Sequence, residues 1–315
     1  MVISHTLKRI LSGKVFAGNV SGFSDLLLYG KMIDDGVIIQ TDGSFVSAFR
    51  FRGSDLETST NEELAMLSKH INNAFNLLGS GWLFHIETIR YKADEYIKPE
   101  LCHFKYQLAE LIDEERRNIY NNSGSHFENA YAISFTYKPK IDLSNKISLF
   151  FRQATNEPRI DFSYHLQYYQ EKLSEVVELL ALNLSIEQMN SQELLSYISW
   201  CITGENMKLK IPRNYGTFLK HFIASKDLVG GENPKIGDKF LRVITVMGFP
   251  SGSYAGILDK LNYLSCEYRF STRFILIDQY ESNKIIDKID NLWYQKRVGT
   301  SDTVKMSLSI DTNIK

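Results

Sequence analysis

The feature that most restricts the fold is a predicted hairpin followed by a capped helix and another strand. Residues 37–52 read as two strands around Asp42-Gly43, a residue pair that favours a type I′ hairpin turn. Alternation in the second strand places aromatic side chains on one face and arginines on the other. These residues are Phe45, Phe49 and Phe51, and Arg50 and Arg52. The hairpin therefore has one core face and one face toward solvent or a partner.

A helix is expected next, because Thr60-Asn-Glu-Glu63 forms a capping box. Apolar residues then recur at spacings of three and four until Gly79. They are Leu64, Leu67, Ile71, Phe75 and Leu78. Residues 82–91 alternate again, which predicts a strand. A hairpin, a helix and a strand in this order are typical of an α+β layered fold.

The same patterns predict further elements along the chain. Helices are expected from Pro99 toward Tyr120, over 162–184, from the cap at Asn190 to Cys201, over 218–225 and over 282–297. Strands are expected at 129–137, 239–247 and 266–278, with a helix carrying Ile257, Leu258, Leu261 and Leu264 between the last two. The fold class is therefore α+β, with antiparallel or mixed sheets flanked by helices.

Both halves suggest a ferredoxin-like subdomain, since each joins sheet segments through amphipathic helices. The expected division is an N-terminal segment 1–24, a first subdomain 25–204, a second subdomain 205–298 and a disordered or degenerate tail 299–315.

Composition limits the function classes. The 315 residues carry 36 basic and 37 acidic side chains, so no overall positive field draws the chain to nucleic acid or anionic lipid. The three cysteines, Cys102, Cys201 and Cys266, are far apart, which favours reduced thiols over a disulfide framework or a zinc site. The longest uncharged run, 243–258, is too short to span a bilayer as a helix.

Residues 229–240, VGGENPKIGDKF, invite comparison with a phosphate-binding loop. That loop needs Gly, four residues, Gly, Lys and then Ser or Thr, so that backbone amides, an amine and a hydroxyl surround the phosphates and metal. The spacing of Gly231, Gly237 and Lys239 does not match. We assign no catalytic, cofactor-binding or metal-binding residue in this chain.

Three blocks, residues 42–90, 227–264 and 266–278, resemble the N-terminal and central region of the TrbE/CagE family, the cytoplasmic ATPases of conjugative type IV secretion systems. The resemblance spans about residues 25–297. It implies that ATP and magnesium bind in a C-terminal RecA-like domain. It also implies that this region docks on inner-membrane components and on other copies in a ring-like oligomer, at the cytoplasmic side of the bacterial inner membrane. Residues 300–315 do not resemble the family's continuation, which leaves a fragment and a truncated gene both open.

Two groups are candidates for binding a partner. Arg50, Arg52 and Asp55 stand where the family has an Arg-Gly-Asp-like run; alternatively, the arginines form a solvated strand face and Asp55 begins the next helix. Arg269 and Arg273 share one face of strand 266–278, where the alternative to binding is an ion pair with Glu267 or with the final helix.

Two other function classes remain open. A self-contained nucleotide-binding protein or enzyme would use the turn 248–253 with Arg269 and Arg273, and it requires a pocket where these groups converge. Nucleic-acid binding would require a basic groove despite the balanced charge. His85 and Glu87 share a face of strand 82–91, and we interpret them as part of a polar sheet face.

Overall fold

The computed structural model describes residues 22–56, 58–93, 96–139, 163–211, 218–246, 248, 251–254 and 256–297. Within these ranges a seven-stranded sheet has the order β1-β2-β3-β5-β4-β10, and β6 pairs with β3. All of its pairings are antiparallel. The strands are β1 Tyr29–Asp34, β2 Val37–Gln40, β3 Phe45–Gly53, β4 Trp82–Lys92, β5 Phe127–Tyr137, β6 Leu184–Gln188 and β10 Tyr268–Ile275. The α+β class with antiparallel sheets is confirmed.

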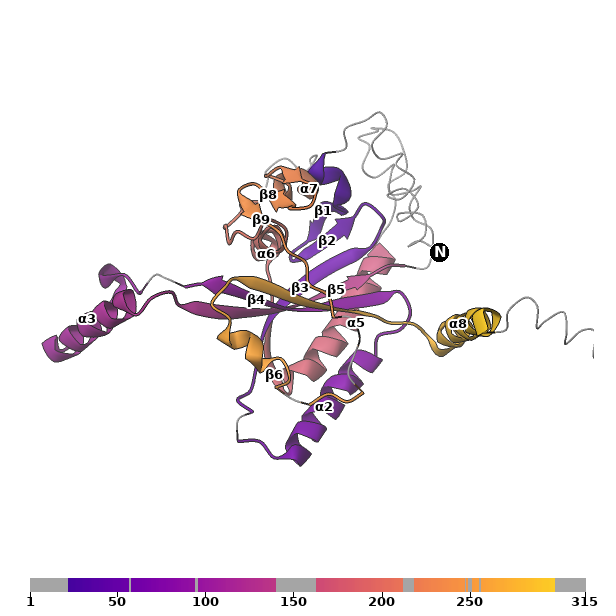
Figure 1. Ribbon diagram of the computed structural model, residues 1–315, viewed down its shortest axis with the longest axis horizontal. Coiled ribbons are helices and arrows are strands. Elements are labelled where there is room, and N and C mark those ends of the chain that lie inside the picture. Colours follow the sequence, from indigo (N-terminus) through magenta and orange to yellow (C-terminus); the bar gives the residue numbers. More distant parts are fainter. Residues whose placement is uncertain are drawn as a thin grey trace, which may run out of the picture.

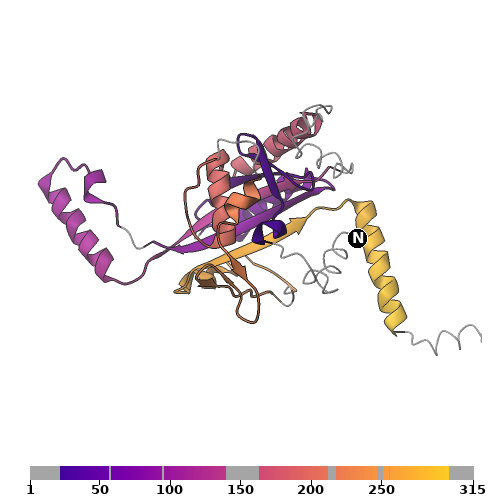
Figure 2. The ribbon, with the colours of Figure 1, turned by 90° about the horizontal axis from the view of Figure 1, so that it is seen from above.

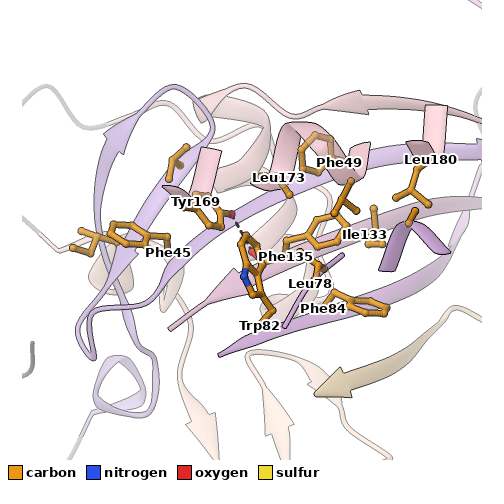
Figure 3. Packing of buried hydrophobic residues seen from close by; sticks show 14 residues of the cluster. Phe45, Phe49, Leu78, Trp82, Phe84, Ile133, Phe135, Tyr169, Leu173 and Leu180 are labelled. Atoms are coloured by element: carbon orange, nitrogen blue, oxygen red, sulfur yellow. Dashed lines mark hydrogen bonds between the residues drawn. The ribbon is translucent and has the colours of Figure 1, made fainter. Parts of the chain in front are cut away.

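One face of the sheet packs against α2 (Asn61–Asn76) and α5 (Ser163–Ala181). Alternate residues of β3, β4 and β5 supply the aromatic side chains of this core, as the period of two predicts (Figure 3). Tyr169 of α5 is fully buried among them, with its ring 5.3 Å from that of Trp82. Its hydroxyl donates to the carbonyl oxygen of Phe135 at 3.2 Å, so the buried phenol keeps a partner.

The opposite face packs against α6 (Ser191–Thr203) and α7 (Leu219–Ile223). Smaller sheet residues, such as Ala48 and Ala132, face the leucines and isoleucines of these helices. The sheet is thus covered by helices on both faces. The 3-10 helix η1 (Phe23–Leu26) lies beside α7.

The expected capped helices are confirmed. Thr60 accepts from the backbone amide of Glu63 at 3.3 Å, and the Glu63 carboxylate accepts from the amide of Thr60 at 2.8 Å. Asn190 caps α6, which ends at Gly204 in the left-handed conformation.

Two expected helices are shorter than the pattern predicts. The helix from Pro99 is a 3-10 turn, η2 (Pro99–Leu101), followed after a break by α3 (Gln107–Asn122). Cys102 and His103 lie in this break rather than inside a helix. The helix expected over 162–184 ends at Ala181, because Leu184 starts β6, which pairs with the outer part of β3.

The strand predicted at 239–247 is wrong. Residues 228–240 form a small three-stranded sheet of β7 (Leu228–Val229), β8 (Lys235–Ile236) and β9 (Lys239–Phe240). After it, residues 241–246 have no regular secondary structure. Their side chains are not buried, since Val243 is 87% exposed and Ile244 is 93% exposed. The helix expected around Leu261 is the 3-10 helix η3 (Asp259–Tyr263).

The proposed division of the chain stays a prediction, and residues 1–21 and 298–315 lie outside the described residues. The two halves share one sheet, however, because β10 pairs with β4. The last described helix, α8 (Gln279–Arg297), follows β10. Figures 1 and 2 show α3 and α8 extending away from the sheet at opposite ends of the molecule.

Candidate functional site

Glu87 of β4 lies at the centre of a buried polar cluster on the sheet face that carries α6, and it is 2% exposed. One carboxylate oxygen accepts from the Tyr197 hydroxyl at 2.5 Å and from the Cys201 thiol at 3.2 Å, both in α6. The other accepts from the Ser271 hydroxyl at 3.0 Å and from the Arg269 guanidinium, both in β10. Glu87 therefore connects three elements that are distant in sequence.

The protonation states in this cluster follow from burial and from Arg269. Burial raises the pKa of Glu87, but the hydrogen bond and charge of Arg269, with the Tyr197 and Cys201 hydrogen bonds, bring it below its usual value. Burial raises the pKa of Tyr197 well above its ordinary range, and it also raises the pKa of Cys201. At neutral pH the carboxylate is charged and the thiol is protonated. Since the thiolate is the reactive form of cysteine, Cys201 is a hydrogen-bond donor rather than a nucleophile.

Arg269 also donates to the carbonyl oxygen of Cys201 at 2.9 Å, in the last turn of α6. Arg269 thus pairs with Glu87, and not with Glu267 or the final helix as the alternative to partner binding supposed. Glu267 lies 3.7 Å from the amine of Lys239 instead. The physical reason is that a buried carboxylate at Glu87 needs a cation far more than an exposed one does. Arg273 shares the face of Arg269, stands opposite His85 in the strand register and is exposed.

His85 and Glu87 do lie on one polar sheet face, but the sequence interpretation missed how deeply Glu87 is buried. Burial lowers the pKa of His85, and Arg273 and Arg269 lower it further against the opposing effect of Glu87. His85 is therefore neutral at physiological pH.

Arg50, Arg52 and Asp55 follow one another along the chain. A guanidinium nitrogen of Arg50 lies 2.8 Å from the carboxylate of Glu193 in α6 and 3.6 Å from that of Glu187 in β6. Arg52 and Asp55 are exposed, and Asp55 precedes the start of α2 instead of beginning the helix. Arg50 has a structural role, and partner binding by these three residues stays a prediction.

The structure does not support a pocket shared by the turn 248–253 and the β10 arginines. Phe249 and Pro250 lie outside the described residues, and Arg269 is already held by Glu87. The shallow hollow beside η3 is lined by Thr88 and Phe270, which lie on the opposite sheet face from Arg269. Across the described ranges, His, Cys, Asp and Glu side chains do not gather in groups of three or more that could hold a metal ion.

The segment VGGENPKIGDKF, compared above with a phosphate loop, forms β7 to β9 and their turns. Gly237, with φ of 55°, provides the tight turn before β9. The Lys239 amine donates to the carbonyl oxygen of Gly204 at 2.8 Å, at the end of α6. This lysine supports a helix end rather than a phosphate.

Two projecting helices carry apolar residues that face solvent. On α8 the exposed residues are Ile285, Ile286, Ile289, Leu292 and Trp293. On α3 they are Leu108, Leu111, Ile112 and Ile119. Contiguous apolar surface of this kind is typical of protein interfaces. None of the described helices has the length and hydrophobicity needed to cross a bilayer.

Both halves of the chain match families of type IV secretion proteins. Residues 36–144 match the family described as "Type IV secretion system ATPase VirB4/TrbE, N-terminal domain". Residues 183–314 match "CagE, TrbE, VirB family, component of type IV transporter system".

Individual relatives belong to the same conjugal-transfer and type IV secretion proteins as the two family matches. The chain is 29% identical over 298 residues to the conjugal transfer protein TrbE of Rhizobium radiobacter, covering 90% of this chain and 36% of that protein. It is 34% identical over 126 residues to the first segment of a probable conjugal transfer protein TrbE of Sinorhizobium fredii, covering 40% of this chain and 85% of that segment. It is 20% identical over 318 residues to the type IV secretion system protein virB4 of Brucella suis, covering 93% of this chain and 37% of that protein. The chain thus spans little more than a third of the two longer relatives.

Proposed function

Because the chain belongs to the TrbE/CagE family of type IV secretion ATPases, we propose that it is a docking and oligomerisation region of a conjugal-transfer ATPase. In this proposal the region lies at the cytoplasmic side of the bacterial inner membrane, held peripherally by inner-membrane components of the secretion system. It also contacts other copies of itself in a ring-like oligomer, while ATP and magnesium bind in another domain of the family's full-length proteins.

The observation that carries the proposal is the pair of projecting helices, α3 and α8. Each of them exposes a row of large apolar side chains. Leaving apolar surface in water costs about 25 cal/mol per Å². Two such surfaces at opposite ends of one molecule are better suited to holding partners than to enclosing a small substrate (Figure 1).

The arrangement of polar groups supports a region without its own hydrolysis. The nucleotide-binding alternative used the turn 248–253 with Arg269 and Arg273, and the rejected comparison with a phosphate loop involved Lys239. Lys239 and Arg269 are both engaged by groups of the chain itself. The proposal therefore assigns no phosphate-binding role to either side chain.

The first test adds labelled ATP and magnesium to the purified chain. We expect neither saturable binding nor turnover. Saturable, magnesium-dependent binding would contradict the proposal and favour the nucleotide-binding alternative.

The second test measures docking directly. Each inner-membrane component of the cognate transfer system is purified in detergent and combined with the chain at micromolar concentration. We expect at least one component to elute together with the chain in size-exclusion chromatography. If every component elutes separately, the docking role is wrong.

A further inference from the structure

We infer that α3 of one copy packs against α8 of the next copy, so that helices from opposite ends of the chain form the contact between protomers. This inference rests on the oligomerisation role proposed above and names the surfaces that would perform it. It is based on the apolar stripes of the two helices, on the charges beside those stripes and on the positions of the helices.

The α3 stripe is one side of a helix whose other side is already occupied. Asp113 accepts from the Tyr96 hydroxyl at 2.7 Å and from Arg117 at 3.0 Å. Tyr120 stacks on His126 with ring centroids 3.7 Å apart. These contacts attach α3 to the segments that precede and follow it in the chain. The stripe points the other way, and Leu108 is 70% exposed.

The α8 stripe follows the spacing of a helix that packs on another helix. Ile285, Ile289 and Leu292 recur at intervals of four and three, and Ile286 and Trp293 extend the same face. All five side chains are between 44% and 70% exposed. The described part of the chain therefore leaves this face of α8 uncovered.

Each stripe has charges of one sign on one side and of the other sign on the opposite side. On α3, Glu114 borders the stripe three residues after Leu111, with Glu110 one turn before it, and Arg116 borders the other side at Ile112. On α8, Lys288 borders the stripe three residues after Ile285, with Lys284 one turn before it, and Asp290 borders the other side at Ile286. These charged residues are all exposed. Paired helices use such flanking charges to select their partner and their orientation.

The positions of the helices require the two stripes to meet between copies. α3 extends from the end of the β4–β5 hairpin, and α8 follows the opposite end of β10, so the helices project in different directions (Figures 1 and 2). Their 16 and 19 residues correspond to roughly 24 Å and 28 Å of helix at 1.5 Å per residue. A contact of one end with the other end of a neighbour is heterologous, and it closes into a ring when the rotation between copies allows.

A helix of a second copy fits the α3 stripe better than a lipid surface does. Glu115 lies within the stripe, Glu114 borders it, and Glu110 lies one turn from Glu114. An anionic bilayer repels these carboxylates and attracts lysines. The lysines of α8 supply the complementary charge without a membrane.

A charge-swap experiment tests the inference by analytical ultracentrifugation of the whole chain. We expect E110K with E114K, and separately K284E with K288E, to weaken self-association at least about tenfold, because like charges then face each other. The first variant then carries lysines beside both stripes, and the second carries glutamates beside both. In an equimolar mixture each contact between unlike variants pairs lysines with glutamates, so we expect the mixture to associate more strongly than either variant alone. E62K with E232K is the control for the first variant, since it adds the same positive charge away from both helices.

Each outcome decides a different point. If the wild type associates and the charge swaps have no effect, the α3–α8 contact is wrong while the oligomerisation role stands. If the wild type stays monomeric at all concentrations, both are wrong. Binding of the monomer to vesicles of anionic lipid, with no self-association, would assign α8 to a membrane surface instead.

A crosslinking experiment checks the geometry without altering charge. Two variants, L111C and I289C, are prepared in a C266S background and mixed. Because a disulfide requires Cα atoms within about 7 Å, we expect a heterodimer of the two variants on mild oxidation. Homodimers that form equally well in each variant alone would indicate a symmetric contact and overturn the inference.

Discussion

Arg269 of β10 holds Glu87 of β4 in an ion pair that joins the two parts of the chain matched by different family models. The pair lies under α6, whose Tyr197 and Cys201 donate to the same carboxylate. The edge strand β10 is thus joined to β4 and α6 by the buried Glu87 carboxylate and the four side chains that donate to it. This arrangement makes the attachment of β10 open to direct measurement.

Replacing Arg269 with methionine should destabilise the fold strongly. Removing one partner of a buried ion pair typically costs about 3–5 kcal/mol, because the other charge remains buried and unpaired. The Arg269 side chain is 38% exposed, so water compensates in part and we expect about 2–3 kcal/mol. Urea unfolding followed by circular dichroism measures this. R273M on the same strand face is the matched control and should change the free energy of unfolding by less than about 0.5 kcal/mol.

The same cluster should make stability depend on acid pH. The pKa of Glu87 is lowered in the folded chain, so its contribution is complete above the unfolded value of about 4.3 and is lost as pH falls through the folded value. Glu87→Gln removes this titration. We therefore expect the stability difference between wild type and E87Q to be largest near neutral pH and to shrink below about pH 4. A difference that stays constant from pH 7 to pH 3 would contradict the assignment.

Gly36 should tolerate no side chain. It turns the chain between β1 and β2 with φ of 66°, and a Cβ there would lie 2.4 Å from the carbonyl oxygen of Met189. We expect G36A to destabilise the fold by roughly 2–3 kcal/mol through backbone strain and this clash. A Cβ at Gly53 would meet no atom of the described residues within 4 Å, so G53A should be close to neutral. Thermal unfolding of the two variants compares them directly.

The cysteines should react in a fixed order. Cys266 is exposed. Burial raises the pKa of Cys201, so its thiol stays protonated and donates a hydrogen bond to Glu87. We expect a maleimide at neutral pH to modify Cys266 rapidly and Cys201 only after unfolding. Peptide mass spectrometry over time locates the label. Rapid labelling of Cys201 in the native chain would show that the cluster opens.

The sequence was most informative where local signals and burial agree. Thr60 and Asn190 are caps in the structure because each can satisfy free amides of a helix with its own side chain. Strand β6 was missed, since its partner is the distant outer part of β3 and the alternation of Leu184 and Ile186 extends over only five residues. Residues 239–247 have strand-forming composition, but in the described structure only β9 at their start has a strand beside it.

The candidate site was harder to predict for a related reason. Alternation correctly placed Arg269 and Arg273 on one face, yet only the pairing of β10 with β4 brings Arg269 to Glu87. One signal was available: Glu87 lies within β4, whose neighbouring residues belong to the cores on both faces of the sheet. An acidic residue in such a strand demands a cation or several donors.

The late position of β10 in the chain has a consequence for synthesis. Strand β4 leaves the ribosome well over a hundred residues before the strand that covers its edge. During that interval its backbone donors and acceptors are open to pairing with other nascent chains, and Glu87 lacks its counter-ion. Emergence of residue 275 from the ribosome is therefore the point at which the growing polypeptide can first shield this edge from aggregation.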